Sequence, residues 1–174
     1  MRRTLKQEFF GRPTLEVAQD LLGKFLVRRF RDKLIASEIV EVEAYDGFRD
    51  KASHASRGLT ARNKVMFGEA GHWYIYFTYG MHWMLNIVVG PENYPAAVLI
   101  RGVKGITGPG RLTKYFKIGG GLNGRECSRK SALWIEDRGV RIASKNMKRT
   151  KRVGVDYAGK YWANRRWRFI DRET

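Results

Sequence analysis

The segment LIASEIVEVEAY, residues 34–45, is long and rich in Ile and Val, and this composition predicts an extended β-strand. Side chains two positions apart on a strand share one face, so Glu41, Glu43 and Tyr45 are expected to point the same way. The apolar residues that alternate with them point the opposite way, into the core. On this pattern alone, an exposed edge strand with solvated glutamates is slightly favoured over a functional site.

The remaining elements are predicted from turn signals and from the spacing of apolar residues. A helix is expected to open at Pro13-Thr14 and to end at Gly23, and a second helix to cover Arg111–Ile118. Further strands are predicted over residues 25–30, 73–78, 82–89, 96–103, 132–135 and 167–170, and a flexible glycine-rich loop over residues 119–124. Strands outnumber helices and strand–helix–strand units are few, which predicts an α+β fold. We expect a single domain over residues 1–174, with a mainly antiparallel curved sheet flanked by helices.

The chain is strongly basic, with 34 Lys and Arg against 17 Asp and Glu among its 174 residues and a formal net charge of +17. So large an excess of one sign is best explained by a polyanionic partner, and nucleic acid is favoured. A membrane surface is the competing partner, but membrane-binding proteins usually concentrate their charge on an amphipathic helix or a polybasic cluster. Here the charge is spread along the chain, with local density at residues 28–31, 145–152 and 165–168. A solvated basic surface without a partner is the plain alternative.

Composition excludes several classes of protein. Hydrophobic residues make up 43% of the chain, which is too many for a disordered basic tail. No apolar stretch is long enough to span a bilayer, and no apolar run follows the charged start, so neither a membrane span nor a secretion signal is predicted. The single Cys127 excludes an internal disulfide, and His54, His72 and His82 lack the spacing of a metal site. We expect a soluble intracellular monomer, cytoplasmic and nucleoid-associated if prokaryotic, that needs no metal or cofactor.

Aromatic residues gather further along the chain. Tyr74 and Tyr76 share one face of the strand predicted over residues 73–78, and Tyr79 lies beside the turn residue Gly80. Together with the carboxylates, these rings predict a hollow that holds a flipped base by stacking while a carboxylate acts at its sugar. Ordinary cross-strand packing of the tyrosines is the alternative.

A set of motifs recurs in order along nearly the whole chain, from about Leu15 to Ile170. The motifs are Glu41-Val42-Glu43-Ala44-Tyr45, His54, Thr60-Ala61-Arg62-Asn63, Met66-Phe67, Tyr74-Ile75-Tyr76, Tyr79-Gly80-Met81, Asn86-Ile87, Leu99-Ile100-Arg101 and Arg152-Val153-Gly154-Val155 with Ala158-Gly159. As an ordered set they resemble the alkyladenine (3-methylpurine) DNA glycosylase family, although residues 104–129 match it poorly. The resemblance implies a monofunctional glycosylase of base excision repair. Such an enzyme flips an alkylated or deaminated purine (3-methyladenine, hypoxanthine or ethenoadenine) from double-stranded DNA and hydrolyses its N-glycosidic bond.

The resemblance also implies a role for each matching residue. Glu43 corresponds to the carboxylate that activates the attacking water, and Arg101 to the arginine that helps to hold this water. The implied base pocket consists of Tyr45, His54 and Tyr76, whose rings sandwich the base, and of Asn86, which excludes guanine at the floor. Tyr79 corresponds to the wedge that enters the duplex. Contacts with the DNA backbone are expected from Arg62, Gly80, Met81, Arg111 and Lys114.

These residue types suit the reaction. Glycosidic cleavage passes through a sugar with oxocarbenium character, which an anionic Glu43 would stabilise while taking a proton from water. We expect Arg101 to lower the pKa of Glu43 and so keep the carboxylate ionised. Glu41 is the chief rival for the catalytic role, while Asp46 and Asp50 are expected to serve in turns or at the surface. The alternative function is a non-catalytic nucleic-acid-binding module that shares the fold.

Overall fold

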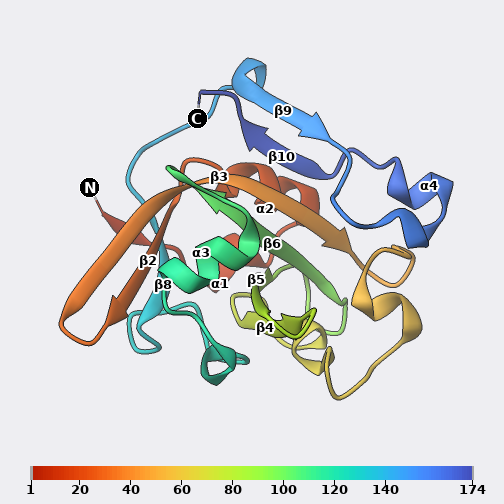
Figure 1. Cartoon of the computed structure of the whole chain (residues 1–174), viewed down its shortest axis with the longest axis horizontal. Coiled ribbons are helices and arrows are strands. Elements are labelled where there is room, and N and C mark those ends of the chain that lie inside the picture. Colours follow the sequence, from red (N-terminus) through yellow and green to blue (C-terminus); the bar gives the residue numbers. More distant parts are fainter. Residues whose placement is uncertain (1, 174) are drawn as a thin grey trace.

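Strand β3, Lys33–Asp46, crosses the middle of the molecule, and the rest of the sheet is assembled around it (Figure 1). Its first half pairs with β2, Phe25–Phe30, and its second half lies between β10, Arg168–Asp171, and β6, Ala96–Val103. Residues 34–45 therefore belong to a central strand. The expectation of an exposed edge strand is wrong, because neighbours on both sides cover the stretch that carries the two glutamates.

The computed structural model describes residues 2–173. Its sheet holds ten strands, all paired antiparallel, in the order β1-β8-β2-β3-β6-β5-β4, with β10 joining β3 to β9 and β7 pairing with β6. The other strands are β1 Arg3–Thr4, β4 Trp73–Thr78, β5 His82–Val88, β7 Ile106–Thr107, β8 Leu133–Asp137 and β9 Met147–Thr150. The helices are α1 Gln7–Phe10, α2 Thr14–Leu21, α3 Pro109–Tyr115 and α4 Lys160–Ala163. Short 3₁₀ turns are η1 His54–Arg57, η2 Lys64–Phe67, η3 Gly120–Leu122, η4 Ser144–Asn146 and η5 Asp156–Ala158.

The predicted α+β fold and its mainly antiparallel sheet are confirmed, and most predicted strands lie within a residue or two of their expected bounds. Helix α3 begins two residues earlier than expected, at Pro109, because proline fits the first turn of a helix without losing a hydrogen bond. Strands β1, β7 and β9 were not predicted, since two to four residues are too few to show a period. The glycine-rich loop contains η3, where a Cβ on Gly120 would lie 2.6 Å from the Trp83 ring.

The main hydrophobic core joins the sheet to helices α2 and α3. Val42 and Ala44 point into it from β3, as the alternation of the sequence predicted. Two smaller apolar clusters lie apart from this core. In one of them Ala55 and Met66, from the turns η1 and η2, pack with Tyr74, and in the other segments before η1 and around η5 meet beside Tyr45. These connections therefore cover the part of the sheet that bears the polar residues of β3.

The loop after β3 begins with a glycine that two constraints require. Gly47 has φ +71°, a left-handed conformation that is costly for other residues, and a Cβ on it would lie 2.4 Å from the Tyr94 ring. The Tyr94 hydroxyl donates a hydrogen bond to Asp46, which also accepts one from Thr14 at the start of α2. Gly47 thus allows β3, α2 and Tyr94 to be tied together.

None of the helices within residues 2–173 is long and apolar enough to cross a membrane.

Two glycine variants separate the stability cost of crowding against Tyr94 from the stability cost of backbone strain. Gly58 also has a left-handed φ, +86°, but a Cβ there would meet nothing within 4 Å. Gly58→Ala should therefore cost only the strain, about 1–2 kcal/mol, whereas Gly47→Ala should cost about 1–3 kcal/mol more. In thermal unfolding, each kcal/mol lowers the Tm of a chain of this size by roughly 2–4 °C. Equal losses of Tm in the two variants would contradict the proposed crowding.

Candidate active site

Four adjacent strands place the polar residues of the site in one row. Glu43 on β3 is the register partner of Leu99 on β6, Leu99 is the partner of Asn86 on β5, and Asn86 is the partner of Tyr74 on β4. Directly opposed residues in an antiparallel sheet share a face, so these four side chains project from the same side. Strands lie about 4.8 Å apart, which puts Glu43 and Asn86 roughly 10 Å apart across the sheet.

Glu43 is entirely buried, with 0% of its surface exposed. Its Oε1 accepts a hydrogen bond from the backbone N–H of Val153 at 2.8 Å, and its Oε2 accepts one from the Tyr45 hydroxyl at 2.9 Å. The Arg101 Nε lies 3.5 Å from Oε1. The carboxylate is thus held by donors from β3, from β6 and from a segment more than a hundred residues further along the chain.

Burial raises the pKa of the Glu43 carboxyl above its ordinary value, because the charged form loses its hydration. The Arg101 guanidinium and the hydrogen bonds from Val153 and Tyr45 act in the opposite direction but do not cancel the burial. The expectation that Arg101 sets a lowered pKa is therefore wrong in its net direction. The result is a carboxylate that is a stronger base than an exposed glutamate.

Glu41, the rival carboxylate, is committed to an ion-pair cluster. Its Oε1 accepts hydrogen bonds from the Nε of Arg101 at 2.8 Å and from the Nε of Arg168 at 2.7 Å. The pairing of β3 with β6 is irregular here, because Val42 pairs with Ile100 while Glu41 pairs with Gly102. Arg101 is the extra residue of this β-bulge, a device that redirects a side chain. Glu41 therefore serves to position Arg101 beside Glu43.

Three aromatic rings lie together at one end of this row: Tyr74, which belongs to the row, and its neighbours His54 and Tyr76. The His54 Nδ1 lies 2.9 Å from the Tyr74 hydroxyl, and the His54 ring centroid lies 4.6 Å from that of Tyr76. Burial, with a contribution from the Arg62 charge, lowers the pKa of His54, so its ring is neutral at neutral pH. Burial raises the pKa of Tyr74 to about 12 and that of Tyr76 well above its ordinary value. The three rings form a compact, uncharged wall.

The loop that carries His54 is pinned by a buried asparagine. The Asn63 side-chain amide donates hydrogen bonds to the carbonyls of His54 and Gly58, while its Oδ1 accepts one from the Thr60 N–H. Neighbouring Arg62 places its guanidinium 5.1 Å from the Tyr76 ring centroid and donates a hydrogen bond to the Phe77 carbonyl. The motif around Arg62 thus fixes the aromatic wall.

Asn86 is buried, and its Nδ2 donates a hydrogen bond to the Tyr74 carbonyl at 3.1 Å. Its amide is therefore held against the neighbouring strand. The structure brings Asn86 into the row with Glu43 and Tyr74, and it brings His54 and Tyr76 to one end of the row. Tyr45 joins the group through its bond to Glu43.

The tip of the β4–β5 hairpin presents a strained and exposed tyrosine. Tyr79 and Gly80 both have left-handed φ, +53° and +65°, as in the two-residue turns that suit the twist of a hairpin. This conformation is unfavourable for tyrosine and is found at functional sites more than elsewhere. Tyr79 has 79% of its surface exposed and Met81 has 67%, so two large apolar side chains project into solvent together.

Helix α3 packs beside this hairpin. A Cβ on Gly110 would lie 2.7 Å from the His82 ring, and the Thr113 hydroxyl donates a hydrogen bond to the Trp83 carbonyl. Arg111 and Lys114 are exposed on α3. They lie on an element that contacts the hairpin, whereas Arg62 approaches the same hairpin through the Phe77 carbonyl.

Comparison with known protein families identifies the family of the chain. A family model described as methylpurine-DNA glycosylase matches residues 8–108 and 103–174. The chain belongs to the methylpurine-DNA glycosylase family. Its membership makes it a DNA glycosylase, a hydrolase of DNA repair, as the resemblance of the motifs predicted.

Individual members of the methylpurine-DNA glycosylase family match the chain closely. A protein of Methanocella arvoryzae is 45% identical over 98% of this chain and 93% of its own length. A protein of Legionella pneumophila strain Corby is 41% identical over 99% of this chain and 96% of its own length. A protein of Streptomyces avermitilis is 58% identical over 58% of this chain and 47% of its own length. Each is named "Putative 3-methyladenine DNA glycosylase".

An internal ion pair of this family member was missed by reasoning from its sequence. The Nη1 and Nη2 atoms of Arg152 donate hydrogen bonds to the Oδ2 and Oδ1 atoms of Asp50, at 2.5 and 2.8 Å, and both side chains are fully buried. The expectation that Asp50 serves in a turn is confirmed, because its Oδ1 also accepts a hydrogen bond from the Ala52 N–H, but the expectation that it lies at the surface is wrong. Arg152 likewise does not belong to the solvated charge of residues 145–152. Arg152 also donates to the Ala44 carbonyl, which places the adjacent Val153 N–H on Glu43. The ion pair joins residues 102 positions apart, so no local pattern marks it.

Residues 2–173 contain no group of three or more His, Cys, Asp or Glu side chains placed to hold a metal ion. Cys127 is buried, and burial raises the pKa of its thiol. His72 bonds the Glu69 carbonyl.

The raised pKa of Glu43 predicts how stability depends on pH. The folded state holds the carboxyl proton more tightly than the unfolded chain does, so stability is lost as the pH rises from the ordinary value of 4.5 through the raised pKa. Glu43→Gln removes this ionisation, and glutamine can still accept from Val153 and donate to the Tyr45 oxygen. The variant should therefore have a higher Tm than the native protein at neutral pH and lose that advantage below pH 4.5.

Glu136 provides a control of opposite sign. Burial acts to raise its pKa, but hydrogen bonds from Trp134 and Arg138 outweigh the burial, and the net pKa is lowered. Glu136→Gln should lower the Tm at neutral pH and have less effect in acid, because its ionised form stabilises the fold. Thermal unfolding across a pH series measures both variants. A lower Tm for Glu43→Gln at neutral pH would contradict the assignment.

Proposed function

We propose that the protein is a monofunctional DNA glycosylase that removes alkylated or deaminated purines from double-stranded DNA, among them 3-methyladenine, hypoxanthine and ethenoadenine. The observation that carries the proposal is the fully buried Glu43 carboxylate in one row with Asn86 and beside an uncharged aromatic wall. A module that only binds nucleic acid gains nothing from a buried carboxylate, which costs stability. The printed name shared by the relatives agrees with 3-methyladenine as one substrate.

The base would be held between Tyr45 and the wall formed by His54 and Tyr76. His54 and Tyr76 are in contact at 4.6 Å, which leaves no space for a base between them, so they act as one side. Tyr45, tied to Glu43, is the other side. Stacking of a base on aromatic rings contributes about 1–3 kcal/mol per base and favours a flipped, electron-poor purine. Because His54 is neutral, the wall does not repel a cationic base such as 3-methyladenine.

Glu43 would act on water at the sugar. The water oxygen attacks C1′ as the bond from C1′ to N9 breaks, the base leaves with the bonding electrons, and Glu43 takes the proton of the water. The raised pKa makes Glu43 a better proton acceptor, and its charge stabilises the oxocarbenium character of the sugar. Arg101 would orient Glu43 and the water, since its Nε lies 2.8 Å from Oε1 of Glu41 and 3.5 Å from Oε1 of Glu43. The product is an abasic site in an intact strand.

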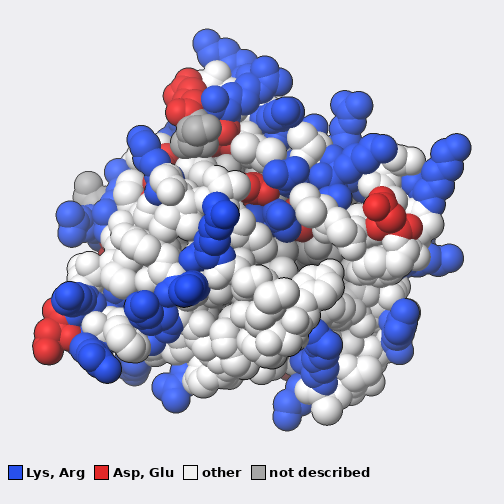
Figure 2. All heavy atoms as spheres, viewed as in Figure 1, with Lys and Arg blue, Asp and Glu red and all other residues white. Residues whose placement is uncertain are grey.

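Tyr79 would enter the duplex in place of the flipped nucleotide. Its exposure at a hairpin tip and its strained backbone suit a side chain kept ready for insertion. Arg62, Gly80, Met81, Arg111 and Lys114 lie in or beside this hairpin, where the DNA backbone would pass. Lys and Arg are scattered over the upper half and the rim of the face in Figure 2 and outnumber the acidic groups there, which suits a polyanion along a broad path. A single chain supplies all of these residues, in keeping with a monomer.

Glu43→Gln tests the catalytic role. Because glutamine keeps the shape but can neither accept the proton nor carry charge, single-turnover excision of hypoxanthine should fall by roughly 10²–10⁴-fold or more. Affinity for the same lesion duplex should stay within a few-fold. The abasic product is read out by alkaline cleavage on a gel, with Glu136→Gln as the control for an unrelated buried carboxylate. Excision near the native rate in Glu43→Gln, or an adduct trapped by borohydride with the native protein, would overturn the mechanism.

Asn86 would discriminate between purines at the floor of the site. Its amide is tied to the Tyr74 carbonyl and cannot swing aside, so the 2-amino group of guanine would clash or stay unpaired. An unpaired buried donor costs about 1–3 kcal/mol, a roughly ten- to hundred-fold preference for hypoxanthine. Asn86→Ser should raise the ratio of guanine to hypoxanthine excision by that factor. The ratio of single-turnover rates is insensitive to a general loss of activity, and an unchanged ratio in a folded variant would remove Asn86 from the site.

A further inference from the structure

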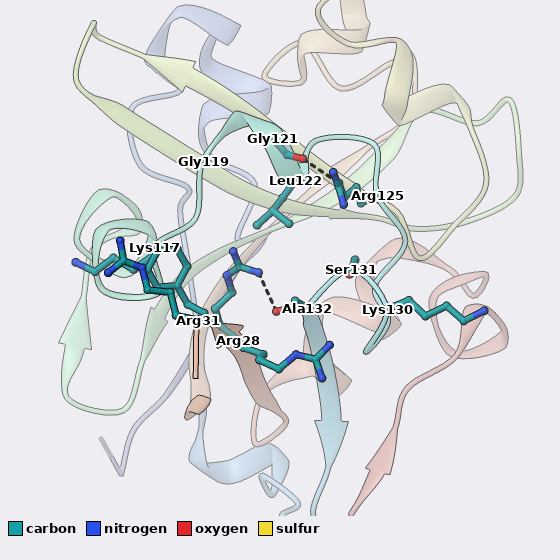
Figure 3. A pocket seen from close by; sticks show the side chains of 12 residues that line it. Arg28, Arg31, Lys117, Gly119, Gly121, Leu122, Arg125, Lys130, Ser131 and Ala132 are labelled. Atoms are coloured by element: carbon teal, nitrogen blue, oxygen red, sulfur yellow. Dashed lines mark hydrogen bonds between the residues drawn. The ribbon is translucent and has the colours of Figure 1, made fainter. Parts of the chain in front are cut away.

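One hollow is lined by six cations, and none of the residues around Glu43 is part of its lining. It has a volume of about 440 Å³, and its cationic residues are Arg28, Arg29, Arg31, Lys117, Arg125 and Lys130. Figure 3 shows Arg31 and Lys117 on one side of it and Arg125 and Lys130 on the other, with Arg28 between them. We call these six residues the cationic hollow. They come from β2 with the turn after it and from the segment between α3 and β8.

The cationic hollow contains no counter-charge. None of its lining residues is acidic, and within residues 2–173 none of the six cations forms a salt bridge. A second hollow of about 340 Å³ is different, because it mixes five cations with Glu8, Asp20 and Asp137 and contains two salt bridges. Like charges held together repel one another, so a bound anion would stabilise the cationic hollow.

Three of its four arginines are held by hydrogen bonds to backbone carbonyls. Arg28 donates to the Ala132 carbonyl at 2.9 Å, Arg29 to the Arg129 carbonyl at 3.1 Å, and Arg125 to the Gly121 carbonyl at 2.9 Å. A guanidinium has five N–H donors, so each of these arginines keeps donors for a ligand. Burial and the nearby charge of Arg125 lower the pKa of Arg28, in keeping with cations gathered without an acid.

The hollow is linked to the β4–β5 hairpin. Its wall includes Gly119 and Gly121, and Gly120 between them lies against the Trp83 ring on β5. Trp83 is the register partner of Phe77, which is two residues before Tyr79, so Trp83 lies about 7 Å from the hairpin tip along the strand. A duplex rises 3.4 Å per base pair, and the hollow, which lies beyond the Trp83 ring, is therefore about two or more base pairs from the proposed wedge. Backbone phosphates of the same duplex would reach it there.

We propose that the cationic hollow binds phosphates of the DNA backbone at a distance from the lesion and so extends the footprint of the enzyme along the duplex. This inference rests on the proposed function for the position of the wedge. The phosphodiester is the ligand that fits, because it is a repeated single anion with oxygen acceptors for guanidinium and ammonium donors. The hollow would hold the protein on DNA without affecting the chemical step.

The test neutralises three exposed cations of the hollow, in the variant Arg31→Gln/Lys117→Gln/Lys130→Gln. The control, Arg3→Gln/Lys6→Gln/Arg141→Gln, removes the same charge from the mixed hollow. A third variant, Arg31→Lys/Lys117→Arg/Lys130→Arg, keeps the charge of the cationic hollow and reports on folding. Binding is measured against salt on two duplexes with a central tetrahydrofuran abasic analogue. One has 25 base pairs, and the other has 7 base pairs closed by a neutral ethylene-glycol linker.

On the long duplex, each lost phosphate contact should reduce the slope of log K against log salt by about 0.9. The hollow variant should therefore lose about 2–3 from the slope and bind at least roughly tenfold more weakly at 0.1 M salt, while the control and charge-keeping variants stay near the native slope. On the short duplex, which has only three base pairs on either side of the lesion, the loss of slope in the hollow variant should be smaller than on the long duplex. Equal losses in the hollow and control variants, or a native slope in the hollow variant, would overturn the proposal.

Two further measurements separate the sources of failure. In the first, inorganic tripolyphosphate is added as a competitor. If the hollow variant no longer binds tripolyphosphate but keeps the native salt slope on DNA, the hollow is a site for free polyphosphate. That result would overturn the proposal of a DNA-backbone site. Excision of hypoxanthine at saturating DNA should be the same in the hollow variant and the native protein. A native protein that shows the predicted slopes but excises nothing would overturn the proposed function and leave the phosphate site standing.

Discussion

A carboxylate without exposed surface, Glu43, is the constraint on which the organisation of the site depends. Burial disfavours its charge, so the surrounding structure must supply hydrogen bonds and a cation to offset the loss of water. Val153, Tyr45 and Arg101 do so from three separate parts of the chain, and they meet because β3 lies between β10 and β6. The ionised form of Glu43, which the proposed reaction uses, destabilises the folded state. The site therefore lowers the stability of the protein.

The charged residues divide into two populations with different physics. Inside the protein, Asp50 with Arg152 and Glu41 with Arg101 and Arg168 are paired at close range, and breaking a buried pair costs roughly 3–5 kcal/mol. At the surface, most Lys and Arg within residues 2–173 form no salt bridge, and positive charge is spread over the face in Figure 2. The first population fixes the geometry of the site. The second leaves the net charge of +17 free to act on a polyanion.

Features that depend on residues close together in the sequence were predicted correctly, whereas contacts between residues far apart in the sequence were not. The alternation along β3 indicated which residues enter the core, and the turn residues bounded β4 and β5 closely. The same alternation could not tell a central strand from an edge strand, because that depends on where β10 and β6 pair. The direction of the Glu43 pKa was missed for a related reason: the charge of Arg101 is visible in the sequence, but the depth of burial is not.

The bulge at Arg101 and the pair of Asp50 with Arg152 show the same limit in the site itself. A bulge is one residue out of register between two strands, and no spacing within either strand reveals it. Asp50 and Arg152 each stand in polar surroundings in the sequence, where a solvated role is the ordinary expectation. Matching motifs named the residues that gather around Glu43. Only the fold supplies the reason why Val153, through its backbone, is among them.

The bond from the Val153 N–H to Glu43 has a consequence for biosynthesis. A ribosome makes the chain from its N-terminus, so β3 and its glutamates emerge long before residue 152. Until then Asp50 has no guanidinium beside it, Glu43 lacks its backbone donor, and β10 has not closed over β3. A growing or prematurely terminated chain therefore holds the Glu43 carboxylate without its backbone donor and without the cover of β10. The surroundings of Glu43 are completed only after the segment that carries Val153 and strand β10 have been made.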